Sequence, residues 1–201
     1  MRIENTDQLE ALYGTARGRA KNKVLAELEQ HSTNFIHKSP FLILSTYSSE
    51  GNMDASPRGG GPGFVKVLDN HTIAIPDGKG NNRLDSFRNI IDTGRVGLLF
   101  LIPGMDETLR INGSAYITTE EAIIDLFTDQ QHRPKTSLII EIEEVFLHCA
   151  KALMRSRLWA ADAQIERKEL PTMGQMLKDQ LNDDIVPETQ EEMVARYKKS
   201  L

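Results

Sequence analysis

The chain has 201 residues, of which 39% are hydrophobic and 26% are charged, and its formal net charge is −5. This composition is typical of a globular protein and argues against intrinsic disorder. The length favours a single domain with a sizeable core. The isoelectric point of about 5.6 disfavours a strongly basic nucleic-acid-binding protein.

The first 34 residues are helical in pattern. Thr6 is expected to cap a short helix that carries Leu9 and Leu12. A basic run over residues 17–23 opens a second expected helix, which continues over residues 24–28. This basic run could touch phosphates, but a solvated helix face is the favoured interpretation.

From Phe35 onward the pattern becomes that of strands. Runs rich in β-formers predict strands at 41–47, 54–58, 64–68, 72–76, 96–102, 108–117 and 137–148. Gly113 inside a strand predicts a bulge or a close approach, and the Glu143-Glu144 pair also predicts a bulge. Helices are predicted at about 82–92, ended by Gly94, and around 121–127. Strands joined by hairpins and short helices indicate an antiparallel barrel.

The chain after Ala150 returns to a helical pattern, and residues 161–201 read as an amphipathic appendage. Cys149 is the only cysteine, so no disulfide can form within the chain, and a cytoplasmic location is expected. We expect Cys149 to be a small buried side chain. The longest apolar run, 96–102, is far shorter than the roughly 20 residues that span a bilayer, so no membrane partner is expected.

The densest polar cluster is the loop 76–83, with the sequence PDGKGNNR, which opens onto a predicted helix. Its glycines allow the backbone to approach an anion, and a helix N-terminus adds N–H donors. Lys79 and Arg83 supply positive charge. The loop is neither a Walker loop nor a Rossmann fingerprint. The alternative is an ordinary solvated connection between a strand and a helix.

Three further clusters could contact a ligand. Arg58 ends a predicted strand next to the glycines of 59–63 and could meet the same anion. Alternation places Thr108, Arg110 and Asn112 on one strand face, which suits either a planar ligand or an ordinary wet face. The third cluster, on one helical stripe, could clamp an anionic aromatic ligand or belong to a plain amphipathic helix; it consists of Lys151, Arg155 and Trp159.

Motifs for metal binding or nucleophilic catalysis are lacking. The five histidines show no H-x-x-x-H or H-E-x-x-H spacing, and there is no second cysteine, so no metal site is expected. The serine-hydrolase pattern G-x-S-x-G is also missing. No catalytic residue can be assigned from the sequence.

Four segments together resemble the pyridoxamine 5′-phosphate oxidase-like flavoproteins, and more closely a bacterial subfamily of uncharacterised FMN-binding members. They are SPFLILSTYSSEGNMDASPRGGGPGFV, TIAIPDGKGNNRLDSFRNI, VGLLFLIPGMDETLRINGSAYIT and HCAKALMRSRLW. They cover about residues 39–159 in the family's order. The resemblance implies a mainly β fold with flanking helices, an antiparallel split β-barrel, and a homodimer with FMN at the subunit interface.

The resemblance also implies a single domain and a set of cofactor-binding residues. The domain would have a helical segment 1–34, a barrel core 35–160 and a helical appendage 161–201. By this resemblance, the FMN phosphate and ribityl region would be surrounded by Arg58, Lys79, Asn82 and Arg83. Glu107, Thr108 and Arg110 would approach from a strand, which the resemblance assigns to the partner subunit. The full implied set is Ser56, Arg58, Gly59, Gly60, Pro76, Asp77, Lys79, Asn81, Asn82, Arg83, Glu107, Thr108, Arg110, Arg155 and Trp159.

The chain departs from the true oxidase at the substrate-binding motifs. The basic motifs that hold pyridoxal phosphate there, including an Arg-rich C-terminal ending, are not visible. We therefore expect an FMN-dependent oxidoreductase acting on an unknown small molecule, with no nucleic-acid partner. The alternatives are a flavin-binding or sensing protein without efficient turnover, and a haem- or deazaflavin-binding relative on the same fold. In the haem case His148 would be the axial ligand.

Overall fold

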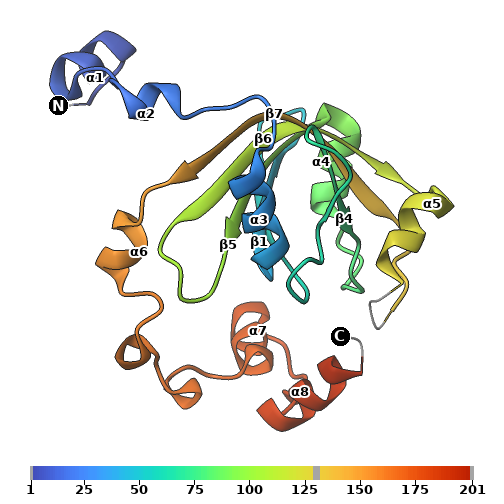
Figure 1. Cartoon of the computed structure of the whole chain (residues 1–201). Coiled ribbons are helices and arrows are strands. Elements are labelled where there is room, and N and C mark those ends of the chain that lie inside the picture. Colours follow the sequence, from blue (N-terminus) through green and yellow to red (C-terminus); the bar gives the residue numbers. More distant parts are fainter. Residues whose placement is uncertain (1, 129–131, 200–201) are drawn as a thin grey trace.

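The computed structural model describes residues 2–128 and 132–199, which fold around one antiparallel sheet. Its seven strands lie in the order β2-β1-β5-β6-β7-β4-β3, and the described strands leave it open between β2 and β3 (Figure 1). The strands are β1 (Phe41–Tyr47), β2 (Met53–Gly59), β3 (Lys66–Val67), β4 (Thr72–Pro76), β5 (Arg95–Leu101), β6 (Thr108–Thr118) and β7 (Ser137–His148). The predicted mainly β, antiparallel split barrel is confirmed. The strand predicted at 64–68 is wrong in length, because only Lys66 and Val67 pair with β4.

The main core lies on the inner face of the curled sheet. Strand alternation places Leu42, Phe100 and Leu109 side by side on this face, and each is at most 1% exposed. Two helices cover the inner face, namely α3 (Gln30–Lys38) and α4 (Asp85–Thr93). On part of the outer face, Ala74 and Ile139 form a smaller core with Phe127. Phe127 comes from the short helical stretch of α5 (Glu121–Ile124) and η1 (Asp125–Phe127).

The longest strand pair, β6 with β7, contains the predicted irregularity. Its register shifts between Asn112 and Gly113, which lie opposite Glu144 and Ile142, so one residue of β7 is skipped. A Cβ atom on Gly113 would lie 2.0 Å from the carbonyl oxygen of Glu141. Both the bulge and the close backbone approach at Gly113 are therefore confirmed.

The N-terminal segment differs from the prediction. Helix α1 (Thr6–Tyr13) is capped by the side chain of Asn5 rather than by Thr6. Helix α2 (Arg19–Asn22) is short, and the predicted helix over residues 24–28 is wrong. Leu25 instead exchanges two backbone hydrogen bonds with Val145 of β7. This pairing is available because β4 covers only residues 137–141 along that edge of β7.

Helix α3 was not predicted, and it runs across the boundary expected at residues 34 and 35. The carboxylate of Glu29 accepts hydrogen bonds from the backbone N–H groups of His31 and Ser32. The backbone N–H of Glu29 donates to the Ser32 hydroxyl in return. This reciprocal cap begins the helix, and Phe35 and Ile36 bury its inner side in the main core.

The C-terminal region is helical, as predicted, and Figure 1 shows its last helices beneath the sheet. It comprises α6 (Lys151–Ser156), η2 (Ala161–Ala163), η3 (Arg167–Glu169), α7 (Met173–Leu181) and α8 (Gln190–Lys198). The described residues of α6, α7 and α8 include none that is fully buried. Cys149, expected to be buried, is exposed. No helix within the described ranges is both long and apolar enough to cross a membrane.

Candidate functional site

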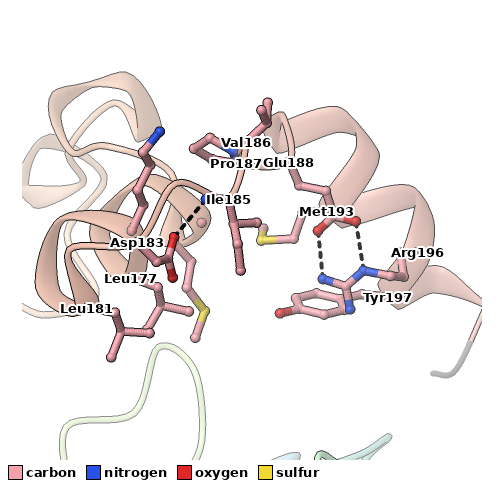
Figure 2. Close-up of a pocket in the computed structure, with 13 residues that line it drawn as sticks. Leu177, Leu181, Asp183, Ile185, Val186, Pro187, Glu188, Met193, Arg196 and Tyr197 are labelled. Atoms are coloured by element: carbon pink, nitrogen blue, oxygen red, sulfur yellow. Dashed lines mark hydrogen bonds and ion pairs between the residues drawn. The ribbon is translucent and has the colours of Figure 1, made fainter.

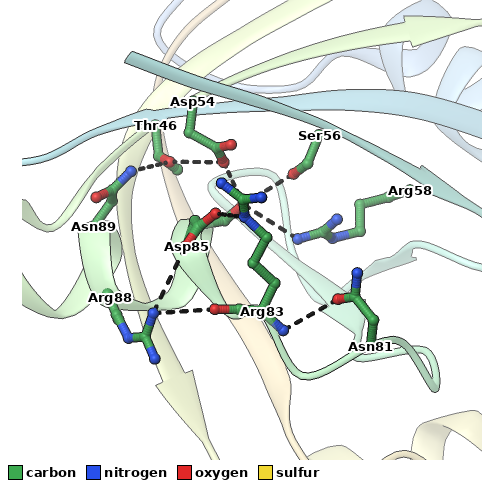
Figure 3. Close-up of polar contacts among 10 residues, drawn as sticks. Thr46, Asp54, Ser56, Arg58, Asn81, Arg83, Asp85, Arg88 and Asn89 are labelled. Atoms are coloured by element: carbon green, nitrogen blue, oxygen red, sulfur yellow. Dashed lines mark hydrogen bonds and ion pairs between the residues drawn. The ribbon is translucent and has the colours of Figure 1, made fainter. Parts of the chain in front are cut away.

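Strand β2 presents a row of polar side chains toward α4 (Figure 3). Asp54, Ser56 and Arg58 alternate along the strand and are half-buried, whereas the residues between them are exposed. The register pairs Arg58 with Leu42, so this row faces the inside of the sheet. A row of three polar groups on the core side of a strand requires partners, and α4 supplies them.

The hydroxyl of Ser86, in the first turn of α4, is the centre of the polar contacts. Its Oγ donates to Oδ2 of Asp54 at 2.6 Å. The same oxygen lies 2.9 Å from Oγ of Ser56 and accepts from Nη2 of Arg58 at 3.4 Å. One donated and two accepted hydrogen bonds satisfy the hydroxyl fully. Ser86 therefore fixes the position of Arg58 relative to the start of the helix.

A second contact holds α4 against the sheet one turn further along. The buried side chain of Asn89 donates from Nδ2 to Oγ1 of Thr46 at 2.9 Å. The Thr46 hydroxyl lies in turn 3.4 Å from Oδ2 of Asp54. Because Ser86 and Asn89 are three residues apart, both face β1 and β2 from one side of the helix.

The loop before α4 leaves the helix N-terminus open. The helix begins at Asp85 and not at Asn82 as predicted, and the cap residue Leu84 is left-handed, with φ of 59°. No side chain in the described residues caps the first turn. The Arg83 guanidinium pairs with the carboxylate of Asp85, and the Arg83 backbone N–H donates to Oδ1 of Asn81 at 3.1 Å.

Charged groups of the 77–84 loop and of β2 influence one another's pKa values. Burial lowers the pKa of Arg58, against the opposing effect of Asp77 and Asp54. Burial also raises the pKa of Asp77, against the opposing effect of Arg58 and Lys135. The hydrogen bond and charge of Asp85 raise the pKa of Arg83, with a further contribution from Asp54. The cations of this end therefore share nearby carboxylates.

The donors at this end suit a phosphate group. Strand β2, the 77–84 loop and the first turn of α4 together supply these donors. They are two guanidinium groups, two serine hydroxyls and the uncapped backbone N–H groups of α4. Such a set matches the geometry by which proteins hold phosphate at helix N-termini. We call this group of residues, Ser56, Arg58, Asp77, Arg83 and Ser86, the α4 site.

The remaining residues predicted for this end have simpler environments. Pro76 is buried at the end of β4, paired with Ser137, while Lys79 and Asn82 are exposed on the loop. Gly59 ends β2. A Cβ atom on Gly60 would lie 2.7 Å from Cβ of Phe64, so packing alone requires glycine there.

The second predicted group lies elsewhere in the chain. The strand register places four paired residues on the inner face, namely Arg58, Leu42, Phe100 and Leu109. Because neighbouring residues of a strand point to opposite faces, Arg110, next to Leu109, faces outward. One chain therefore cannot bring Arg58 and Arg110 to the same face of the sheet. Glu107 is exposed just before β6, and Thr108, expected beside Arg110 on a ligand-facing edge, is buried.

The predicted helical stripe of Lys151, Arg155 and Trp159 is wrong. Helix α6 ends at Ser156 because Arg157 is left-handed, with φ of 52°. Trp159 lies beyond the helix and donates from Nε1 to the carbonyl oxygen of Met105 at 2.9 Å. Arg155 donates to the carbonyl oxygen of Lys151 in its own helix. The tryptophan thus lies against the turn between β5 and β6.

Sequence reasoning missed Asp54, Ser86 and Asn89. The alternation of residues 54–58 could have placed Asp54 on the face of Ser56 and Arg58. Ser86 and Asn89 have the spacing of one helix face, but polar helix residues normally indicate a solvent-facing side. Here that side packs on the polar row of β2.

A separate cavity of about 400 Å³ lies between α7 and α8 (Figure 2). Apolar side chains such as Leu177, Ile185 and Met193 line much of it. An ion pair at its rim, between Arg196 in the last turn of α8 and Glu188 just before that helix, has a distance of 2.7 Å. The cavity contains neither the serines nor the arginines of the α4 site.

Comparison with known proteins identifies the family. The family model described as pyridoxamine 5′-phosphate oxidase matches residues 28–149, which is more than half of the chain. The chain belongs to this family, as its resemblance predicted. None of the curated proteins compared with the chain is a match in sequence.

Solved structures add the following likenesses. HupZ of Group A Streptococcus is 21% identical, with a TM-score of 0.50 over 60% of this chain and 93% of that one. This likeness shows the fold. An FMN-binding protein of Syntrophomonas wolfei is 13% identical, with a TM-score of 0.44 over 58% of this chain and 88% of that one. HutZ of Vibrio cholerae, described as a haem storage protein, is 14% identical, with a TM-score of 0.41 over 60% of this chain and 93% of that one.

Proposed function

We propose that the protein is an FMN-dependent oxidoreductase for a small organic molecule, with the FMN phosphate bound at the α4 site. The observation that carries the proposal is the half-buried Arg58, held by Ser86 beside an uncapped helix N-terminus. Guanidinium and backbone N–H donors bind phosphate strongly in such a setting. Bound FMN would supply hydride transfer, and the protein would supply binding and orientation.

Different residues would contact the phosphate, the ribityl chain and the flavin ring. Arg58, Ser56 and Ser86 would hold the phosphate from the sheet side. Lys79, Asn81, Asn82 and Arg83 would approach it and the ribityl chain from the exposed loop. Ser56 to Gly60 and Pro76-Asp77 would line the flavin. Arg83 would have to exchange its contact with Asp85 for the phosphate.

A homodimer would complete the site. The outer face of β2, β1 and β5 leaves apolar side chains open, among them Met53 at 75%, Tyr47 at 39% and Phe41 at 37% exposure. Exposed apolar patches of this kind mark protein contacts. A second copy seated there would present its Glu107, Thr108, Arg110, Arg155 and Trp159 to the flavin. This arrangement agrees with the opposite faces of Arg58 and Arg110.

The whole chain is proposed to act as one domain, a barrel core with helical extensions at both ends. The cytoplasm is the proposed location, because a lone exposed thiol such as Cys149 persists in a reducing compartment.

The test is flavin binding by the purified protein. We expect a yellow preparation that releases FMN, identified by mass, or takes up added FMN in a fluorescence titration. Arg58→Ala and Arg83→Ala are each expected to weaken FMN binding about tenfold to a hundredfold, through loss of charge-assisted hydrogen bonds. Arg167→Ala is the control, because among the described residues its side chain donates to backbone carbonyls of its own segment and to no residue of the α4 site. Equal affinity in all three variants contradicts the assignment.

A second measurement separates an enzyme from a flavin carrier. The bound flavin is expected to be reduced by NADH or NADPH and reoxidised by an acceptor. A protein that binds FMN but is not reduced by either donor contradicts the oxidoreductase and supports a binding or sensing role. A positive pyridine-haemochrome assay, lost in His148→Ala, would instead support the haem-binding alternative.

A further inference from the structure

The hydroxyl group of Thr136, just before β7, has no hydrogen-bond partner although its oxygen is buried. Among the buried and half-buried residues that the structure describes, it is the only hydroxyl with both properties. The neighbouring hydroxyl of Ser137, by contrast, donates to the carbonyl oxygen of Ile75 at 3.0 Å. A buried polar group without a partner costs free energy, so its presence calls for a reason.

Thr136 lies beside the α4 site. The backbone N–H of Asp77 donates to the carbonyl oxygen of Thr136 at 3.0 Å, which extends the pairing of β4 with β7 beyond the ends of both strands. The previous inward pair, Ile75 with Leu138, belongs to the main core. Alternation therefore places Asp77 and Thr136 on the inner side of the sheet, the side that also carries Arg58.

The charges near Thr136 fit a neutral polar ligand better than a phosphate group. Burial raises the pKa of the half-buried Asp77 carboxyl, and the charges of Arg58 and Lys135 oppose this. An ionised carboxylate repels a phosphate but accepts a hydrogen bond from a neutral N–H group. The hydroxyl of Thr136 can donate to a carbonyl oxygen. Asp77 and Thr136 thus offer an acceptor and a donor on neighbouring strand ends.

We propose that the hydroxyl of Thr136 donates a hydrogen bond to the flavin ring of FMN, next to the carboxylate of Asp77. This inference rests on the proposed FMN site and adds a contact that neither the sequence motifs nor the family resemblance names. The polar edge of a flavin ring presents carbonyl oxygens beside an N–H group, which matches a donor beside an acceptor. The bond would give the buried hydroxyl its missing partner.

The hydroxyl lies close to the surface of the molecule. Thr136 is partly exposed, and Lys135 before it is exposed. The loop that follows Asp77, residues 78–84, is exposed along its whole length, so it can shift without disturbing the core. A flavin that enters from this side would displace loop residues and no core residue.

The test compares Thr136→Val and Thr136→Ser with the wild-type protein in fluorescence titrations with FMN and with riboflavin, which lacks the phosphate. We expect Thr136→Val to weaken the binding of both flavins by a similar factor of about threefold to tenfold, the worth of one neutral hydrogen bond. Thr136→Ser keeps the hydroxyl and is expected to retain wild-type binding. Arg58→Ala is expected to weaken the binding of FMN much more than that of riboflavin.

The stability of the flavin-free protein separates a ligand contact from a structural one. Valine has the shape of threonine without the polar oxygen, so Thr136→Val is expected to keep or raise the urea midpoint of unfolding. Thr118→Val is the control, because Oγ1 of Thr118, at the end of the neighbouring strand β6, accepts from the backbone N–H of Glu120 at 3.0 Å. This control is expected to lower the midpoint and to leave flavin binding unchanged.

The outcomes distinguish this inference from the proposed function. Equal flavin affinity in Thr136→Val and wild type overturns the inference and leaves the FMN site intact. A lower midpoint of flavin-free Thr136→Val also overturns it, because the hydroxyl would then hold a structural partner such as a bound water. A loss confined to FMN would place Thr136 at the phosphate and overturn the ring contact. A wild-type protein that binds neither flavin overturns the FMN site, and this inference with it.

Discussion

At the scale of single residues, Gly113 sets the shape of the longest strand pair. A side chain at this position would meet the backbone of Glu141, with 2.0 Å between its Cβ and the carbonyl oxygen. A backbone group cannot move aside as a flexible side chain can. Gly113 therefore lets the two strands approach where the register shifts between β6 and β7.

We predict that Gly113→Ala lowers the free energy of unfolding by about 1–3 kcal/mol, the usual cost of forcing extra atoms into a packed site. Urea denaturation with intrinsic fluorescence measures it. Gly61→Ala is the control, because no heavy atom of the described structure lies within 4 Å of its Cβ position and its φ is not left-handed. Equal unfolding midpoints for the two variants would refute the role of Gly113.

The residue scale also explains which part of the α4 site could be predicted. Arg58 is predicted from a strand end beside a glycine-rich loop, and Ser56 from the family resemblance, and both lie beside α4. Ser86 was missed because a serine in a polar helix turn looks the same whether it faces water or a second polar row. The pairing of α4 with β2, which decides this, is a tertiary contact without a local pattern.

At the scale of elements, helix α3 begins with an N-cap residue, Glu29, that is not among the residue types preferred at this position. Ser, Thr, Asp and Asn are the preferred caps, but here Glu29 accepts from two backbone N–H groups. Burial raises the pKa of Glu29, but its hydrogen bonds to His31 and Ser32 outweigh this, so the pKa lies below the ordinary value of 4.5. The charged carboxylate is therefore the form that stabilises the folded helix.

We predict that Glu29→Ala lowers the free energy of unfolding at pH 7 by about 1 kcal/mol, the typical worth of a cap. Since the folded-state pKa is depressed, this stabilisation is present above pH 4.5 and is lost as the pH falls through the folded-state value. The difference from wild type should therefore shrink at pH 3 in chemical denaturation. Glu191→Ala in α8 is the control. A difference of equal size at both pH values would contradict the cap.

Strands were predicted better than helices for a physical reason. Alternation and β-formers mark a strand locally, and all seven predicted strands are present. The helix predicted over residues 24–28 failed because backbone pairing with β7 outweighed local preference. Helix α3 is not predicted, because the residues from Phe35 onward match a strand pattern.

At the scale of the whole molecule, the open outer face of β1, β2 and β5 bears on assembly. Its apolar residues are partly exposed, whereas the outer face near Ala74 and Ile139 is covered by η1. Burying the open part against a second copy would remove apolar surface from water.

We predict that the protein sediments at twice its 22.6 kDa chain mass. Leu99→Glu, in the middle of the open outer face beside Ile43, is expected to shift it to the monomer. Ile91→Glu is the control, since Ile91 is 73% exposed on α4. Circular dichroism confirms that each variant is folded. A Leu99→Glu variant that stays dimeric places the contact elsewhere.

The backbone pair between Leu25 and Val145 has a consequence for solubility. Beyond Ile142, no strand among the described residues of the sheet pairs with this edge of β7, and a bare edge is a template for pairing with other chains. The N-terminal segment occupies this edge with only two mutual hydrogen bonds and then leaves it. The positive charge of Lys23, whose ammonium group donates to the carbonyl oxygen of Leu147 on this edge, would oppose pairing with an identical edge, so the residues that order the N-terminus would also protect the sheet against aggregation.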